Sequence, residues 1–153
     1  MAKFDEVLRY PVTVQWGDQD AFGHLNNVLY LRYFESARIA YMGGSRWLDD
    51  EALKPIVATV KANYLRQVRF PATLQLFSSV VELRPKGLTL ATLFLDDATG
   101  EPVAECAAVT LSFDFKKQRV VPMPEHVVEH IKEVEKYQVP EIHERLKKNL
   151  LPI

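Results

Sequence analysis

The sequence has only one cysteine, Cys106, and lacks an excess of charge of either sign. A single thiol cannot close a disulfide within the chain, which excludes a disulfide-stapled secreted scaffold and fits a reducing compartment. Its 19 Lys and Arg nearly balance its 20 Asp and Glu, giving a net charge of −1. Because phosphate binding relies on clustered basic residues, and these are scattered, nucleic acid is not expected as a main partner.

Long hydrophobic runs are absent as well. No apolar stretch approaches the ~20 residues that a membrane-spanning helix needs, and the opening segment MAKFDEVLRY lacks the apolar core of a signal peptide. We therefore expect a cytoplasmic protein without a membrane anchor. No internal repeat, low-complexity tract or linker divides the chain, and 153 residues at 48% hydrophobic content suit one domain over residues 1–153.

One strand and one unusual helix are predicted in the first third of the chain. Apolar and polar residues alternate over residues 10–16, which is the period of a strand. Residues 27–42 are apolar around most of a helical wheel, and such a helix is expected to be buried on nearly all sides. Gly43-Gly44 should end it with a left-handed cap.

The rest of the sequence predicts mainly strands. Four segments rich in β-branched and aromatic residues, 56–68, 73–83, 88–96 and 103–115, are separated by short turn signals. Such short connections favour antiparallel neighbours. A short helix follows at about 125–135. Together these elements predict an α+β fold in which a long, curved, antiparallel five-stranded sheet wraps around a central helix.

Long strands leave exposed sheet edges, and a second copy of the chain would cover them. We expect a dimer at least. The last stretch, from about residue 135 to 153, is expected either to form a second helix against the partner subunit or to be loosely held, and no function is assigned to it.

The segment WGDQDAFGHLNNVLY, from Trp16 to Tyr30, carries the chemistry. Asp18 and Asp20 follow a strand, Gly23 allows a bend, and the predicted helix begins near Asn27. A helix start offers unpaired N–H groups and partial positive charge. A carboxylate beside such donors suits acyl-transfer chemistry, although a plain turn or capping role would also explain Asp20.

This segment resembles the N-terminal motif of the 4-hydroxybenzoyl-CoA thioesterase-like family of acyl-CoA thioesterases, which have the hot-dog fold. The shared pattern is an aromatic residue, Asp-x-Asp, Gly, Asn and then a helix with Tyr, aromatic-Glu and Ala-Arg. Here it stands at Trp16, at 18–27, at Tyr30 and at 33–38. The similarity covers about residues 8–125.

The resemblance implies an enzyme that hydrolyses an acyl-CoA, or an acyl group on acyl carrier protein, as a homodimer or homotetramer. Asp20 would be the catalytic carboxylate, acting as nucleophile or as general base on water, and the backbone N–H of Asn27 would polarise the thioester carbonyl. No metal or cofactor is required. It further implies that Arg84, Lys86, Lys116 and Lys117 hold the CoA phosphates, commonly across a subunit interface; as sequence features alone they are ordinary solvated charges.

Several neighbouring residues have open roles. Tyr30 and Tyr33 are expected as core or as walls of an acyl pocket, and Asp18 as a structural partner in the turn. His24 either donates a hydrogen bond to the substrate or shapes the bend.

Glu35 and Arg38, one helical turn apart, are expected as an ion pair between two otherwise buried charges rather than as a second catalytic acid. Two other functions compete with hydrolysis. One is a non-catalytic domain that binds acyl-CoA or acyl carrier protein, and the other is a hydratase or dehydratase that would depend on His24.

Overall fold

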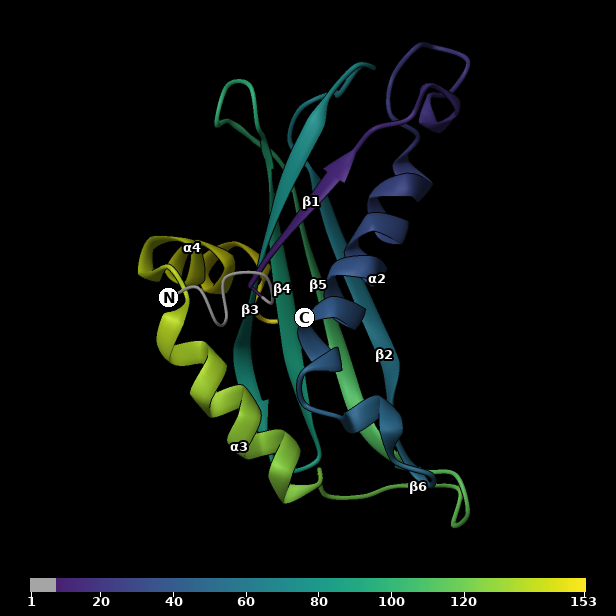
Figure 1. Cartoon of the computed structure of the whole chain (residues 1–153), viewed down its shortest axis with the longest axis vertical. Coiled ribbons are helices and arrows are strands. Elements are labelled where there is room, and N and C mark those ends of the chain that lie inside the picture. The colour runs from purple at the N-terminus through teal and green to yellow at the C-terminus, as the bar shows by residue number, and fades with distance from the viewer. Residues whose placement is uncertain (1–7) are drawn as a thin grey trace.

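The computed structural model describes residues 8–153 (Figure 1). Residues 1–7, which include most of the segment assessed for a signal peptide, lie outside the described part. The strands are β1 (Arg9–Thr13), β2 (Leu53–Tyr64), β3 (Thr73–Arg84), β4 (Gly87–Asp96), β5 (Pro102–Asp114) and β6 (Arg119–Val120). The helices are α2 (Asn27–Gly43), α3 (Glu125–Val134) and α4 (Pro140–Leu150), with short 3-10 turns η1 (Trp16–Asp18), η2 (Trp47–Asp49) and η3 (Glu135–Tyr137).

The predicted long antiparallel sheet is confirmed. Its strands lie in the order β1-β3-β4-β5-β2, and β6 adds a short pairing to β5. Every neighbouring pair is antiparallel. Short turns connect β3 to β4 and β4 to β5, as expected for antiparallel neighbours. The sheet curls around α2, which lies along its inner face (Figure 1). The 12-residue strand β2 forms one edge of this sheet.

Alternation along the strands divides the apolar side chains between the two faces. On β4, Leu90 and Phe94 belong to the main core, whereas Ala91 and Leu93 belong to a second, smaller core. Both α2 and α3 contribute to the main core, which therefore fills the concave side of the sheet. None of the helices in residues 8–153 has the length and apolar character to cross a bilayer.

Helix α2 departs from two expectations. It is not buried on nearly all sides, because Val28, Leu31 and Ile39 are exposed. Its end at Gly44 is right-handed, with φ −66°, so the expected left-handed cap is wrong. A side chain at Gly44 would approach the His130 ring to about 3.0 Å, so this glycine allows α3 to pack close to the end of α2.

The C-terminal segment forms α4, which packs against the outer face of its own sheet. Leu146 and Leu150 are fully buried there, in the same core as Leu93. The buried Glu105 carboxylate of β5 accepts hydrogen bonds from Arg145 Nε at 2.9 Å and from Asn149 Nδ2 at 2.8 Å. These polar bonds offset the cost of burying the Glu105 charge under α4.

Candidate active site

The acidic segment folds into a tight loop between η1 and α2. The Asp20 N–H donates to the His24 carbonyl at 2.8 Å, and the Gly23 N–H donates to the Asp20 carbonyl at 3.1 Å. Gly23 has φ +77°, a left-handed conformation that is strained for other residues, so the glycine in the motif is required by the bend. The Leu25 N–H donates to the Val68 carbonyl at 2.7 Å and fixes the loop to the segment that follows β2.

The Asp20 carboxylate is held by the loop through one of its two oxygens. Oδ1 accepts hydrogen bonds from the N–H of Phe22 at 2.8 Å and of His24 at 3.3 Å. This is the turn geometry that Asp favours regardless of function. The other oxygen, Oδ2, has no hydrogen bond to any residue between 8 and 153. One oxygen therefore fixes the orientation of the carboxylate, while the other has no partner among the described residues.

The start of α2 supplies a donor beside this loop. Asn26 is the N-cap, and its side chain accepts from the Val28 N–H at 3.1 Å. The Leu29 N–H donates to the Asn26 carbonyl at 2.9 Å. Asn27 is the first helical residue, and helix geometry gives its N–H no acceptor within the helix. Of the first three N–H groups of α2, the Asn27 group is the one left without a local acceptor.

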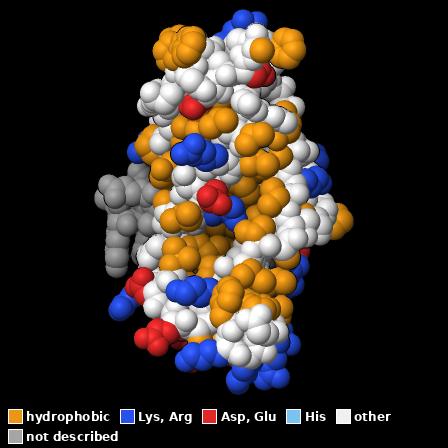
Figure 2. All heavy atoms as spheres, turned by 90° about the vertical axis from the view of Figure 1, so that its right-hand side faces the viewer, with side chains coloured by type: hydrophobic (Ala, Val, Ile, Leu, Met, Phe, Trp, Pro, Cys, Tyr) orange, Lys and Arg blue, Asp and Glu red, His pale blue; other side chains and the backbone are white. Residues whose placement is uncertain are grey.

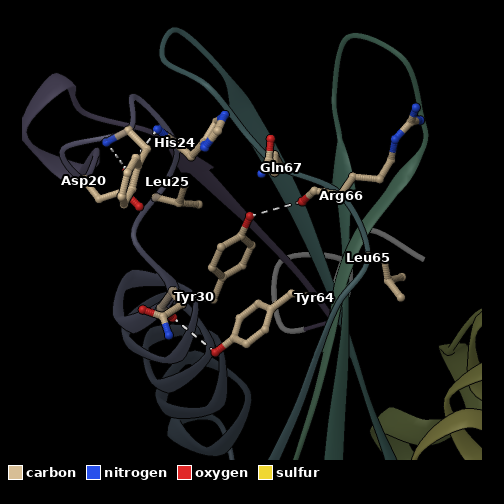
Figure 3. A pocket seen from close by; sticks show the side chains of 10 residues that line it. Asp20, His24, Leu25, Tyr30, Tyr64, Leu65, Arg66 and Gln67 are labelled. Atoms are coloured by element: carbon tan, nitrogen blue, oxygen red, sulfur yellow. Dashed lines mark hydrogen bonds between the residues drawn. The ribbon is translucent and has the colours of Figure 1, made fainter.

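Asp20 and Asn27 line the same cavity, which has a volume of about 620 Å³. Its walls come from the acidic loop, the start of α2 and the end of β2 with the segment after it (Figure 3). The lining residues are Asp20, Phe22, His24, Leu25, Asn27, Tyr30, Tyr64, Leu65, Arg66 and Gln67. The cavity thus combines one carboxylate, helix-start amides and aromatic walls.

Tyr30 and Tyr64 connect the helix start to the sheet. Their rings meet edge to face at 5.2 Å, and the Tyr64 hydroxyl donates to the Asn27 carbonyl at 3.3 Å (Figure 3). Burial, together with the neighbouring Tyr64, raises the pKa of Tyr30 to about 12. Tyr30 is therefore a neutral hydrogen-bond donor at physiological pH and not an acid catalyst.

His24 lines the cavity with an unused ring nitrogen. Its Nε2 is buried and has no hydrogen-bond partner among residues 8–153. A buried polar atom of this kind costs free energy unless a ligand or water satisfies it. The position is compatible with a hydrogen bond to substrate, which was one of the two roles expected from the sequence.

Tyr33 and Asp18 lie behind the loop and not in the cavity. The Tyr33 hydroxyl donates to Asp18 Oδ2, which also accepts from the Gln15 N–H at 2.9 Å. Asp18 therefore has the structural role predicted for it. Burial and the bond to Asp18 raise the pKa of Tyr33 above its ordinary value.

The four basic residues expected to hold the CoA phosphates, Arg84, Lys86, Lys116 and Lys117, are far from the cavity within one chain. Gly87, beside Arg84 and Lys86, pairs with Leu111 on β5, whereas Tyr64 at the cavity pairs with Ala104. Leu111 and Ala104 are seven residues apart, which is about 23 Å along a strand. Lys116 and Lys117 follow Asp114, farther still along the same direction. These four residues therefore lie at the opposite end of the sheet from Asp20.

Glu35 and Arg38 are not the buried pair expected from the sequence. Their charged groups are 4.0 Å apart, and the Glu35 side chain is 65% exposed while that of Arg38 is 14% exposed. The expectation that both charges are buried is wrong for Glu35, whose side chain lies at the groove between α2 and β2 and is mostly exposed to solvent. The two groups also lie outside the cavity that contains Asp20.

Sequence reasoning missed the far wall of the cavity. Leu65, Arg66 and Gln67 line it, but none belongs to a chemical motif. They follow β2, and only the folded register, through the bond from Leu25 to Val68, brings them opposite the acidic loop. No signal in the sequence would have identified them.

Comparison with known proteins shows the family to which the chain belongs. Residues 14–131 match the thioesterase-like superfamily. The chain is 30% identical over 111 residues to the uncharacterized protein YsmA of Bacillus subtilis, covering 72% of this chain and 75% of YsmA. It is 23% identical over 120 residues to the long-chain acyl-CoA thioesterase FadM of Escherichia coli, covering 76% of this chain and 91% of FadM.

A similar solved structure is a thioesterase of Thermus thermophilus complexed with coenzyme A and Zn. It superimposes with a TM-score of 0.74 at 29% identity, over 85% of this chain and 95% of that one. The superfamily match spans well over half of the sequence and includes the acidic loop, α2 and every strand from β2 to β6. The chain therefore belongs to the thioesterase-like superfamily and has the hot-dog fold.

Proposed function

We propose that this thioester hydrolase cleaves acyl-CoA to a free carboxylic acid and CoA, with Asp20 as the reactive carboxylate. The observation that carries the proposal is that Asp20 and the start of α2 line one cavity. Two relatives support the substrate class: FadM acts on long-chain acyl-CoA, and the Thermus thioesterase was solved with coenzyme A. Acyl carrier protein is the alternative donor of the acyl group.

Two routes fit this arrangement, and both begin with the thioester carbonyl near the Asn27 N–H. Asp20 either attacks the carbonyl carbon, forming a mixed anhydride that water then cleaves, or removes a proton from the water that attacks. In either route the carbonyl oxygen gains negative charge, which the helix-start amide stabilises. The C–S bond breaks, the CoA thiolate leaves, and the balance is one water consumed per acid and thiol formed.

The proposal includes a homo-oligomer, either a dimer or a tetramer. Arg84, Lys86, Lys116 and Lys117 bind the CoA phosphates as point charges. Because they lie at the far end of the sheet from Asp20 in their own chain, they serve the cavity of a second, inverted copy. The lone buried thiol, Cys106, agrees with action in the reducing cytoplasm.

The test of the proposed activity is Asp20→Asn, which keeps the size of the side chain and its ability to accept the loop hydrogen bonds. Thiol release from a series of acyl-CoA chain lengths should fall by about 10²–10⁴-fold. Thermal unfolding and CoA binding should stay near wild type. The matched control is Asp49→Asn, an exposed carboxylate of η2 distant from the cavity, which should leave turnover unchanged. Wild-type turnover in Asp20→Asn would refute the assignment.

A further inference from the structure

A second cavity lies between α2 and the edge strand β2, and we call it the α2–β2 cavity. It has a volume of about 160 Å³ and shares no lining residue with the cavity that contains Asp20. Figure 2 shows this side of the molecule, with apolar side chains along it, charged side chains near its middle and a hollow beside them. The apolar part of the lining consists of Ile39, Met42, Leu48, Pro55 and Val57. A concave apolar site takes a small molecule when a few polar groups converge in it.

Thr110 places a hydroxyl without a partner in this lining. The residue lies on β5 opposite Val57 of β2, where the register of the two strands shifts. It is only 2% exposed, and its Oγ1 has no hydrogen-bond partner among residues 8–153. Because a buried hydroxyl without a hydrogen bond costs free energy, this position calls for a polar atom from outside the chain.

Arg38 brings a positive charge to the same cavity. Its side chain is 14% exposed, and its Nε is buried with no hydrogen-bond partner in the described part of the chain. The guanidinium lies 4.8 Å from the centre of the Phe34 ring, which holds it on one side. The nearest carboxylate, that of Glu35, is 4.0 Å away and 65% exposed, so it compensates the charge only weakly. Arg38 therefore favours an acceptor that carries a negative charge.

These features together select a small carboxylate. Water can satisfy either donor, but it brings no charge to a guanidinium that is largely buried. A carboxylate accepts hydrogen bonds from both donors, and its apolar chain covers the wall formed by Ile39, Met42 and Val57. A cavity of about 150 Å³ holds benzene, a molecule of about six heavy atoms. Butanoate is a carboxylate of this size.

We propose that the α2–β2 cavity binds a short aliphatic carboxylate, with its charge on Arg38, one oxygen on the Thr110 hydroxyl and its chain on the apolar wall. Tyr30, in the cavity of Asp20, is eight residues from Arg38 on α2, which is about 12 Å along the helix. The ligand is therefore a second molecule and not the acyl group held beside Asp20. The inference goes beyond the proposed function and does not depend on it, since binding is measured without turnover.

The experiment measures binding of butanoate to the whole protein by calorimetric titration, with butanamide as an uncharged probe of the same size. Wild type should bind butanoate at least about ten times more tightly than butanamide. Thr110→Val keeps the shape of the side chain but removes the hydroxyl, so the affinity for butanoate should fall by about 3- to 10-fold. Without ligand, the same variant should unfold at a higher temperature than wild type, because it removes an unsatisfied buried group. A purely structural hydroxyl would not weaken binding while its loss stabilises the fold.

Two further variants test the charges of the cavity. Arg38→Met should reduce the affinity for butanoate at least about tenfold, whereas Glu35→Gln should increase it, because a competing carboxylate is removed. The matched control is Thr59→Val, the same change at an exposed position of β2 outside the cavity, which should leave the affinity unchanged. If circular dichroism shows that Arg38→Met does not fold, the Thr110 and Glu35 variants still carry the test.

Two results would overturn the proposal: a wild-type protein that does not bind butanoate at millimolar concentration, and a Thr110→Val variant that binds it as tightly as wild type. A titration of the Asp20→Asn variant in the presence of acyl-CoA identifies the source of the carboxylate. Butanoate should bind there as tightly as without acyl-CoA. Displacement only by an acyl-CoA whose chain ends in a second carboxylate would overturn the assignment to a separate molecule.

Discussion

At the scale of single residues, the acidic loop was the most predictable part of the site. Two features explain why: Gly23 is needed for its positive φ, and Asp20 is held by two N–H groups of its own loop. Both features depend on residues no more than four positions apart, so a short sequence motif is enough to predict them. Tyr33 shows the limit of this reasoning, because its hydroxyl turns to Asp18 behind the loop and only packing decides that direction.

The role assigned to Asn27 belongs to its backbone, and proline can remove that donor without breaking the helix. Asn27 is the first residue of α2, where proline is well tolerated. The preceding Asn26 has φ −63° and ψ 133°, the conformation that a residue before proline prefers. Asn27→Pro should therefore fold and lose about 10²–10³-fold in kcat, as enzymes do when one oxyanion donor is removed.

Asn27→Ala is the matched control for this prediction. It deletes the side chain but keeps the N–H, so its kcat should stay within a few-fold of wild type. Both variants need thermal unfolding curves, since only variants of near wild-type stability can be compared. Equal losses in the two variants would show that the side chain, and not the amide, is what matters.

At the scale of elements, the alternation and the helical pattern predicted most boundaries, because core-facing periodicity is a local property. The helix predicted at 27–42 is found at 27–43. What the pattern did not predict is where α4 goes. Its apolar residues Leu146 and Leu150 mark one face of a helix, but the surface that they pack on, which includes Ala91 and Ala107, exists only once β4 and β5 pair in the folded sheet.

A buried carboxylate joins η3 to the sheet and gives this part of the fold a pH dependence. Glu135 accepts from the Tyr41 hydroxyl at 2.6 Å, the Ser79 hydroxyl at 2.8 Å and the Val80 N–H at 2.5 Å. Burial outweighs these bonds and raises the pKa of Glu135 above its ordinary value of 4.5. His143, hydrogen-bonded to Ser79 at 2.7 Å, favours the charged form and acts in the opposite direction.

The sign of the effect follows from proton linkage. Above pH 4.5 the unfolded chain loses the Glu135 proton, while the folded protein keeps it up to its raised pKa. The folded state binds more protons in this window, so the free energy of unfolding falls as pH rises through it. Gln at position 135 cannot ionise. In Glu135→Gln the free energy of unfolding, measured by urea titration, should therefore depend less on pH from pH 4.5 upward. The exposed Glu144→Gln on α4 is the control, and parallel curves for wild type and Glu135→Gln would contradict the prediction.

At the scale of the whole molecule, the sequence predicted a sheet wrapped around a helix and, separately, an association with a second copy of the chain. It did not predict how the carboxylate and the basic residues come together in one site. The motif that contains Asp20 and the turn that contains Lys86 are predictable separately. The distance between them follows from the strand register. One end of β5 pairs with β2 beside the cavity, and the other end pairs with β4 beside the basic turn. A composite site made by two copies would remove this separation, and it can be tested by mixing inactive variants.

The first variant is Asp20→Asn, and the second replaces two exposed basic residues, Lys86→Glu with Lys117→Glu. Each homodimer should release little thiol at low acyl-CoA concentration. In a heterodimer, the intact Asp20 of the second variant faces the intact lysines of the first, so one of its two sites is complete. Half of the dimers in a random mixture are heterodimers, which predicts recovery of about a quarter of wild-type activity. If the lysines instead served their own chain, no site in the mixture would be complete, and activity would stay at the level of the separate variants.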